Sequence, residues 1–486
     1  MFPAICVTNQ NLPDTAAFVE WLRDEQRDFF ASQGEIVVSR APGRLDVMGG
    51  IADYSGALVL QQPIAEATHA ACQLANDETL TVESWQGIES LRFTVSLTDL
   101  TGLAYDAARA WFASDKSRHW AAYVAGVWLV LQRERGAVWR RGARLLLRSD
   151  VPAGKGVSSS AALEVATMQA VTAAYGIALT PLELAFLCQK VENLVAGAPC
   201  GVMDQMASAC GAEGELTAIL CQPGELLGTV KWPAELAVWG LDSGVCHAVS
   251  GGDYGTVRAA AFMGYRIIAD VAGLRFETTV MPGRVRIEDI KWRGYLANIT
   301  PAEFAAKYAA HLPETMSGAA FLQRYQGITD VVTAVEADKI YPVRQAARHP
   351  VEENARVQQF TAILKNWRGL AQADELGALM RESHESYTSC GLGAAATDEL
   401  VELARSEPGL FGAKITGGGS GGTVAVLGRR DAAEAVRRVA AKYAERTGYA
   451  PFLFSGSSPG ACAFGVLRLR PDEQPVATGA RTALSA

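Results

Sequence analysis

Two glycine-rich segments carry residue types suited to binding phosphate groups. In the first, residues 154–162, glycines are followed by a run of three serines. In the second, residues 414–422, a lysine and a threonine precede the glycines. Glycines that run into a helix start leave backbone N–H groups available to an anion. Each segment also has a simpler interpretation, a turn with a serine N-cap for the first and a flexible hinge for the second. Together they predict two loops around one polyphosphate.

The elements around the first loop support this prediction. Residues 143–149 are typical of a strand, and residues 161–175 carry apolar side chains at helical spacing. The loop therefore lies at a strand-to-helix turn, as in nucleotide-binding proteins. It matches neither a Walker loop nor a Rossmann glycine motif. The second loop precedes the apolar run 423–427.

A third motif spans residues 41–54, between strand-like residues 35–39 and 57–61. With the two loops, it follows the order and spacing of the GHMP small-molecule kinases. The chain resembles that family, and within it the galactokinases and the kinase module of L-arabinokinases. Further matches are Arg118 to Val124, Cys200 to Gln205, Asp242 to Tyr254 and Arg348-His349-Pro350.

The resemblance implies an α+β fold of two domains, with the active site in the cleft between them. The N-terminal domain would hold a mixed sheet, and the C-terminal domain would be a ferredoxin-like α/β unit. Trp232-Pro233 interrupts the pattern before a predicted strand at 237–242. We therefore expect domains at 1–232 and 233–470, and a flexible tail at 471–486. Residues 275–347 are interpreted as an insertion, a helical elaboration with a solvated charged face.

Composition limits the partners. A chain of 486 residues can bury two substantial cores, and its net charge of -8 argues against a nucleic-acid surface. Its nine cysteines form no Cys-x-x-Cys pair, which favours reduced thiols in a cytoplasmic enzyme. Neither a signal peptide nor an apolar run of membrane-spanning length is found, so no membrane partner is expected. The expected partners are a small-molecule sugar and ATP, and the oligomeric state is not predicted.

The resemblance assigns catalysis to Asp204 and Arg44. Asp204 would orient and deprotonate the sugar hydroxyl, while Arg44 would keep that carboxylate ionised and stabilise charge on the phosphoryl group. Without the resemblance, Asp204 would be an acidic residue favoured by a helix N-terminus, and Arg44 a surface residue at a strand end.

The resemblance also implies a magnesium site and a nucleotide site. Ser160 and Glu192 would hold Mg²⁺, since hard oxygen donors suit that ion; otherwise Glu192 would be a solvated helix carboxylate. Trp120 would stack on adenine, although a lone tryptophan is more often part of a core. The residues that would bind the ATP phosphates are Gly154, Gly156, Ser158, Ser159 and Ser160.

The sugar contacts carry the substrate prediction. The resemblance places Asp53 and Tyr254 at the ring hydroxyls, with Gly418 and Gly419 closing the substrate side. Galactokinases end the first motif with Gly-Glu-His-Thr-Asp-Tyr, and here Gly50 and Ile51 stand in place of the Glu and His. The polar pair that serves the exocyclic hydroxymethyl group is thus replaced by hydrogen and hydrocarbon.

L-Arabinopyranose is D-galactopyranose without that hydroxymethyl group. The expected activity is therefore ATP- and Mg²⁺-dependent phosphorylation of the anomeric hydroxyl of L-arabinose. Two alternatives stay open: a galactokinase with an altered sugar pocket, and a galactokinase-like sugar sensor without catalysis.

Overall fold

A computed structural model describes residues 12–246 and 252–469. The first domain is built on an eight-stranded sheet in the order β16-β1-β2-β5-β3-β4, with β6 paired to β2 and β7 to β6. All pairs are antiparallel except β3 with β5, so the predicted mixed sheet is confirmed. The strands are β1 (Ile36–Met48), β2 (Leu58–Leu74), β3 (Thr79–Gln86), β4 (Glu89–Ser96), β5 (Ala143–Ser149), β6 (Glu215–Leu220), β7 (Glu225–Lys231) and β16 (Val466–Leu469).

Helix α5 (Ser159–Tyr175) lies at the centre of this domain. Nearly every side chain from Ala161 to Thr172 is buried, as expected for a helix that is apolar on all sides. It packs against β1 and β2 and against neighbouring helices, and these helices and the sheet enclose the largest core cluster of the described residues. The helices of this layer are α2 (Leu97–Thr101), α3 (Tyr105–Ala113), α4 (Ala122–Arg135), α5, α6 (Pro181–Lys190) and α7 (Met203–Cys210), with η3 (His119–Ala121) and the π-helical η4 (Val191–Ala196).

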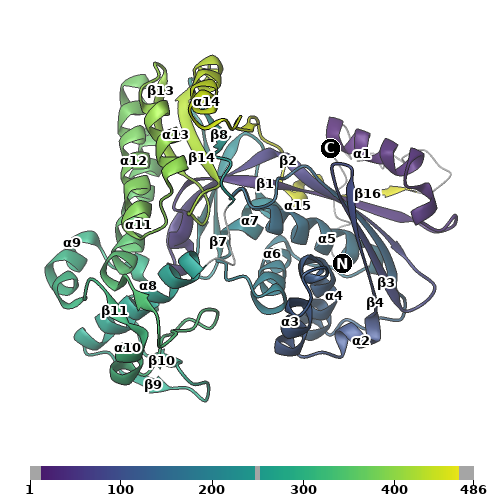
Figure 1. The fold of residues 1–486 in the computed structure, drawn as a ribbon, viewed down its shortest axis with the longest axis horizontal. Coiled ribbons are helices and arrows are strands. Elements are labelled where there is room, and N and C mark those ends of the chain that lie inside the picture. Colours follow the sequence, from purple (N-terminus) through teal and green to yellow (C-terminus); the bar gives the residue numbers. More distant parts are fainter. Residues whose placement is uncertain (1–11, 247–251, 470–486) are drawn as a thin grey trace, which may run out of the picture.

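The second domain contains the sheet β13-β14-β8-β15. In chain order its strands are β8 (Leu236–Asp242), β13 (Leu410–Ile415), β14 (Thr423–Arg429) and β15 (Leu453–Phe454), all antiparallel. The first strand in the chain thus lies between the third and the fourth, which is the ferredoxin-like arrangement that was predicted. Its helices are α11 (Val343–Lys365), α12 (Ala373–Ser389), α13 (Ala395–Arg405) and α14 (Ala433–Thr447). Figure 1 shows this domain in green and yellow beside the purple and blue first domain.

Strand β1 differs from its predicted bounds. We expected a strand at 35–39 followed by the motif at 41–54, but β1 continues into that motif, through Pro42, Gly43 and Arg44 to Met48. Register shifts between Pro42 and Arg44 and between Asp46 and Met48 let the strand contain a proline and still pair with β2. Arg44 is therefore a buried residue within a strand, not a surface residue at its end.

The predicted range of the second domain, residues 233–470, was also wrong at its C-terminal end. Helix α15 (Ala461–Phe464) and β16 lie in the predicted second domain, yet β16 pairs with β1 in the first-domain sheet. Leu467 and Leu469 are buried with side chains of helix α1 (Pro13–Asp24). The pairing joins segments more than 400 residues apart, which a local pattern cannot specify. Figure 1 shows β16 beside α1 at the end of the first domain.

The insertion has more structure than a solvated helical elaboration. It packs on α8 (Gly252–Val271) around buried aromatic residues including Trp292, Phe304 and Phe321. Ile51 and Tyr254 belong to the same cluster, so this core extends to residues predicted to bind the sugar. Its elements are β9 (Phe276–Thr278), β10 (Val285–Ile287), η5 (Leu296–Asn298), α9 (Pro301–Glu303), η6 (Phe304–Tyr308), η7 (Ala309–His311), β11 (Met316–Ser317), α10 (Gly318–Tyr325) and β12 (Ile340–Tyr341).

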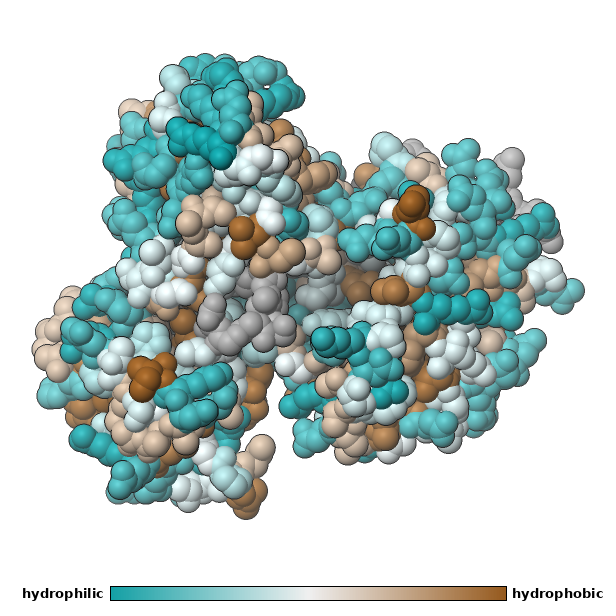
Figure 2. All heavy atoms as spheres, viewed as in Figure 1, coloured by the Kyte–Doolittle hydropathy of each residue, from teal (hydrophilic) through white to brown (hydrophobic). Residues whose placement is uncertain are grey.

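Figure 2 shows a mostly hydrophilic face with a hollow between the lobes of the molecule. Hydrophobic side chains occur on this face mainly as small separate groups. None of the helices within the described ranges is long and apolar enough to cross a membrane.

Candidate active site

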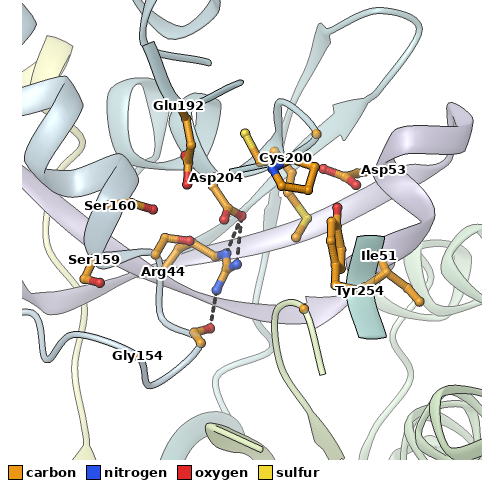
Figure 3. A pocket seen from close by; sticks show the side chains of 16 residues that line it. Arg44, Ile51, Asp53, Gly154, Ser159, Ser160, Glu192, Cys200, Asp204 and Tyr254 are labelled. Carbon is orange, nitrogen blue, oxygen red and sulfur yellow. Dashed lines mark hydrogen bonds and ion pairs between the residues drawn. The ribbon is translucent and has the colours of Figure 1, made fainter. Parts of the chain in front are cut away.

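A pocket between the two domains collects most of the residues predicted to act on a substrate. They come from β1, from η2 (Gly50–Ser55), from the loop before α5, from η4 and α7, and from α8 and the second glycine-rich loop. Figure 3 shows several of these side chains converging on one space. The expected site in the cleft is thus present as a pocket. Its lining residues are Arg44, Ile51, Asp53, Gly154, Gly156, Ser158, Ser159, Ser160, Glu192, Pro199, Cys200, Gly201, Met203, Asp204, Tyr254 and Gly418.

Arg44 and Asp204 form an ion pair at the centre of the pocket (Figure 3). The Nε and Nη2 atoms of Arg44 donate to Oδ1 of Asp204 at 2.9 and 2.7 Å. Nη1 donates to the Gly156 carbonyl at 2.6 Å, so one guanidinium connects the carboxylate to the first glycine-rich loop. Asp204 lies in the first turn of α7, where the helix dipole favours a negative charge. Its side chain is 21% exposed, which keeps it accessible from the pocket.

The first glycine-rich loop has the backbone conformation of an anion cradle. Gly154, Gly156 and Ser158 have φ angles of 71°, 69° and 61°, in the left-handed region that serine rarely adopts. Ser158 precedes α5 but makes no side-chain cap, and its buried Oγ has no hydrogen-bond partner in the protein. The ordinary N-cap interpretation therefore does not explain this serine. A ligand atom in the cradle would satisfy the orphaned hydroxyl.

The second glycine-rich loop packs directly on the first. Thr423 donates its hydroxyl to the Lys155 carbonyl at 2.8 Å, and Lys155 forms a 2.9 Å ion pair with Asp242 at the end of β8. A Cβ at Gly422 would lie 2.8 Å from the Lys155 carbonyl oxygen, so this approach requires a glycine. The second domain thereby holds the cradle in place, and Gly418 lines the pocket.

Glu192 and Ser160 supply oxygen atoms next to the cradle (Figure 3). Burial and the nearby Asp204 raise the pKa of Glu192 to about 7, against hydrogen bonds from Ser160 and Gln205. Gln205 donates through Nε2 to Glu192 at 2.6 Å and to the buried Glu164 at 3.1 Å. A cation here would compensate the buried carboxylates.

The residues present fit a Mg²⁺ ion of the kind that keeps several waters. Such an ion needs only one or two protein oxygens besides phosphate groups. Within the ranges that the structure describes, no three His, Cys, Asp or Glu side chains form a complete metal cage.

Asp53 is held in place on the opposite side of the pocket from the cradle. Burial and the charge of Asp204 raise the pKa of Asp53 to about 7, while Arg258 acts against them. Its Oδ1 has no hydrogen-bond partner in the protein. A Cβ at Gly201 would lie only 1.7 Å from Oδ2 of Asp53, so residue 201 must be glycine. A sugar hydroxyl is a donor of the kind that Asp53 lacks.

The insertion reaches this side through an ion pair. Arg258 on α8 binds Asp330 with two hydrogen bonds of 2.9 Å and donates to the Cys200 carbonyl at 2.9 Å. Both side chains are nearly fully buried. The insertion, to which the sequence assigns no chemistry, thus holds an arginine that bonds to a pocket-lining residue.

Three predicted site residues do not line the pocket. Gly50 is buried behind it, and Gly419 packs against Leu392. Trp120 lies at the edge of the first-domain core, where its Nε1 donates to the Ser117 carbonyl at 3.0 Å. Its role in adenine binding stays a prediction.

Several residues near the site were not identified from sequence. Gln205 directly follows Asp204, and Glu164 lies four positions after Ser160, one helical turn along α5; those spacings could have identified both. No sequence signal identifies Asp330 or Tyr387, because Asp330 lies 72 positions from Arg258 and Tyr387 lies 336 positions from Ile51.

Comparisons with known proteins agree with this architecture. A family model described as GHMP kinases N terminal domain matches residues 122–212, and GHMP kinases C terminal matches residues 368–446. The Galactokinase galactose-binding signature matches residues 26–74, which include Arg44 and Asp53.

The similar proteins include sugar kinases. L-arabinokinase from Arabidopsis thaliana is 43% identical over 91% of this chain, and galactokinase from Chloroflexus aurantiacus is 31% identical over 85% of it. The chain spans 47% of the length of the former and 89% of the latter. The crystal structure of Lactococcus lactis galactokinase complexed with galactose has a TM-score of 0.71 at 21% identity, covering 92% of this chain and 99% of that chain. That likeness shows a shared fold.

Proposed function

Because the chain belongs to the GHMP kinase family, we propose that it is an ATP-dependent kinase that phosphorylates the anomeric hydroxyl of L-arabinose. The products would be L-arabinose 1-phosphate and ADP. The single observation that carries this proposal is the bridge that Arg44 makes between Asp204 and the Gly156 carbonyl of the cradle. That bridge supports the proposal because it would hold Asp204, acting as general base, at a fixed position relative to a loop that binds phosphate, as phosphoryl transfer requires.

In the proposed mechanism Asp204 accepts the proton of the anomeric hydroxyl. Arg44 keeps Asp204 ionised and places positive charge where negative charge develops on the phosphoryl group. The backbone N–H groups around Gly156 and Ser158 hold the phosphates of ATP. Ser160 and Glu192 would hold Mg²⁺, which neutralises phosphate charge when bound.

The sugar preference is supported by Ile51. Its side chain lines the pocket, next to Tyr254 in Figure 3, and offers no hydrogen bond. A sugar hydroxyl buried against this hydrocarbon would lose its partners in water. A pentose that ends in a ring CH₂ has no such hydroxyl, so the pocket favours L-arabinose over D-galactose. The relative named L-arabinokinase supports the same choice.

Two alternatives are weaker. A galactokinase with an altered pocket would have to bind the hydroxymethyl group without a polar residue at position 51. A sugar sensor would have no need of the pair formed by Asp204 and Arg44. Cysteines without disulfides in the described ranges support our assignment of the enzyme to the cytoplasm.

A coupled assay of ADP release with L-arabinose, D-galactose and D-glucuronate tests the proposal. We expect kcat/KM for L-arabinose to exceed that for D-galactose by about 5- to 150-fold, the effect of one unpaired buried hydroxyl. A preference for D-galactose would overturn the pentose assignment. ATP and sugar binding without ADP release would favour the sensor.

A further inference from the structure

Tyr387 occupies the space that a side chain at position 50 would need. Gly50 has a φ of +43°, and a Cβ built on it would lie 1.7 Å from the hydroxyl oxygen of Tyr387. Tyr387 belongs to α12 of the second domain and is fully buried. Its hydroxyl accepts a hydrogen bond from the Ile51 backbone N–H at 2.9 Å and donates one to the Gly417 carbonyl, also at 2.9 Å. The two residues at these positions therefore cannot both be large.

The ring of Tyr387 is held on several sides. The His349 ring meets it edge-on at 5.2 Å between centroids, and Lys414 Nζ lies 5.3 Å from its centroid. Lys414 in turn forms a fully buried 2.6 Å ion pair with Asp46, which accepts a hydrogen bond from the Gly50 N–H. A tyrosine fixed in this way cannot turn aside for a larger residue at position 50.

The two bonds of the hydroxyl join both sides of the pocket. Ile51 lines it from the first domain, and Gly417 directly precedes Gly418, which lines it from the second. Tyr387 itself does not line the pocket, so it acts through these neighbours.

We propose that Tyr387 is a specificity-determining residue that excludes any side chain at position 50 and positions Ile51 as the apolar wall of the sugar site. This inference deepens the proposed function and rests on it. With position 50 limited to glycine, no polar side chain from that position can meet an exocyclic hydroxyl of the sugar. The pocket therefore takes an aldopentose in its pyranose form, which lacks an exocyclic carbon.

The first test is Tyr387→Phe, which keeps the ring and removes both hydrogen bonds. We expect KM for L-arabinose to rise by about 2- to 10-fold, because Ile51 loses the hydrogen bond that fixes its backbone beside the sugar. KM for ATP should change less than about twofold, because the cradle is bound to other residues. Equal increases in both constants, or no change in either, would contradict a role at the sugar wall.

The second test exchanges the two residues by combining Gly50→Glu with Tyr387→Leu. Gly50→Glu alone should lower the Tm strongly, because its side chain overlaps the tyrosine hydroxyl. Adding Tyr387→Leu should recover part of that Tm loss and raise the ratio of kcat/KM for D-galactose over L-arabinose at least about tenfold, as expected for one recovered buried hydrogen bond. Some loss should persist because residue 50 keeps a positive φ and its Cβ would still lie 2.7 Å from Oδ2 of Asp46.

A matched control uses Gly176, which has a φ of +71° and no neighbouring atom within 4 Å of the place that a Cβ would take. Gly176→Glu carries the same change without the overlap, so Tyr387→Leu should not recover its Tm. Absence of recovery in the exchanged pair, or an unchanged sugar ratio, would overturn the inference. If the wild type phosphorylates neither sugar, the proposed function fails, while calorimetric binding of both sugars and the Tm recovery still judge the role of Tyr387.

Discussion

The proposed phosphate end and the proposed sugar end of the pocket are constructed differently. The cradle comes from one short segment, and the groups proposed to bind phosphate are backbone atoms and serines held by left-handed residues such as Gly156 and Ser158. The sugar end is assembled from η2, α7 and α8, with Tyr387 and Asp330 acting from behind. A site made of backbone depends little on side-chain identity. A site made of buried side chains can change its ligand through residues that never touch it.

The largest expected effect is on the residues that join the two ends. Asp204→Ala should lower kcat by about 10²- to 10⁴-fold while ATP still protects the protein against unfolding. Arg44→Ala should also lower kcat, because the guanidinium contacts both Asp204 and the cradle. If the two act as a unit, the double variant should lose less than the product of the single losses. Full turnover by Asp204→Ala, measured as ADP release, would remove it from the mechanism.

The next effect concerns the ion pair behind the sugar end. Asp330→Ala leaves the buried Arg258 without its counter-charge, so we expect the free energy of unfolding in urea to fall by about 3–5 kcal/mol. KM for the sugar should rise more than KM for ATP. Glu336→Gln breaks the exposed pair with Lys339 in the same insertion and should cost no more than about 1 kcal/mol. Similar losses in the free energy of unfolding of the two variants would mean that the insertion contributes to packing but does not support the sugar end through this ion pair.

The phosphate end has its own test in Gly156→Val. A Cβ at Gly156 would lie 3.2 Å from the Thr416 carbonyl, and valine disfavours its φ of +69°. ATP at about 100 times its Kd should stabilise the wild type by about 2.7 kcal/mol, and this protection should vanish in the variant. Gly176→Val controls for the positive φ alone, because that site is open. A folded Gly156→Val variant with normal ATP protection would mean that the phosphates bind elsewhere.

The most gradual effect is a pH dependence at the proposed sugar end, because it is spread over about three pH units. Burial raises the pKa of Asp53 from 3.8 to about 7, so the folded protein binds this proton more tightly than the unfolded chain. Stability from this group is therefore present at low pH and is lost as pH rises between these two values. The loss is at most about 1.4 kcal/mol per pH unit.

Asp53→Asn should flatten this part of the stability curve, measured by urea unfolding at pH 5, 6 and 7. It should also raise KM for the sugar. A variant whose curve has the same slope as the wild type would show that Asp53 does not titrate in this range.

The sequence by itself, through its motifs and their resemblance to the GHMP kinases, predicted the glycine-rich loop at 154–162, the proposed catalytic pair Asp204 and Arg44, and the ferredoxin-like second domain. Residues 154–162 are adjacent in the chain, so their spacing alone predicts a loop whose backbone N–H groups could bind phosphate. The strand at 237–242 and the apolar run at 423–427 were readable from local pattern, and they correspond to β8 and β14, whereas the ferredoxin-like order came from the family resemblance.

Only the tertiary structure decided how the sugar end is closed and where the domains end. β16 joins the first sheet although its partner β1 lies more than 400 residues away in the chain, so no local pattern could predict the pairing. Asp330 likewise forms its buried ion pair only because the fold brings it beside Arg258. Gly50 was predicted to contact the sugar, yet its position behind the pocket follows from the hydroxyl of Tyr387. Such relations depend on which distant side chains share one buried volume, and that is set by packing rather than by local sequence.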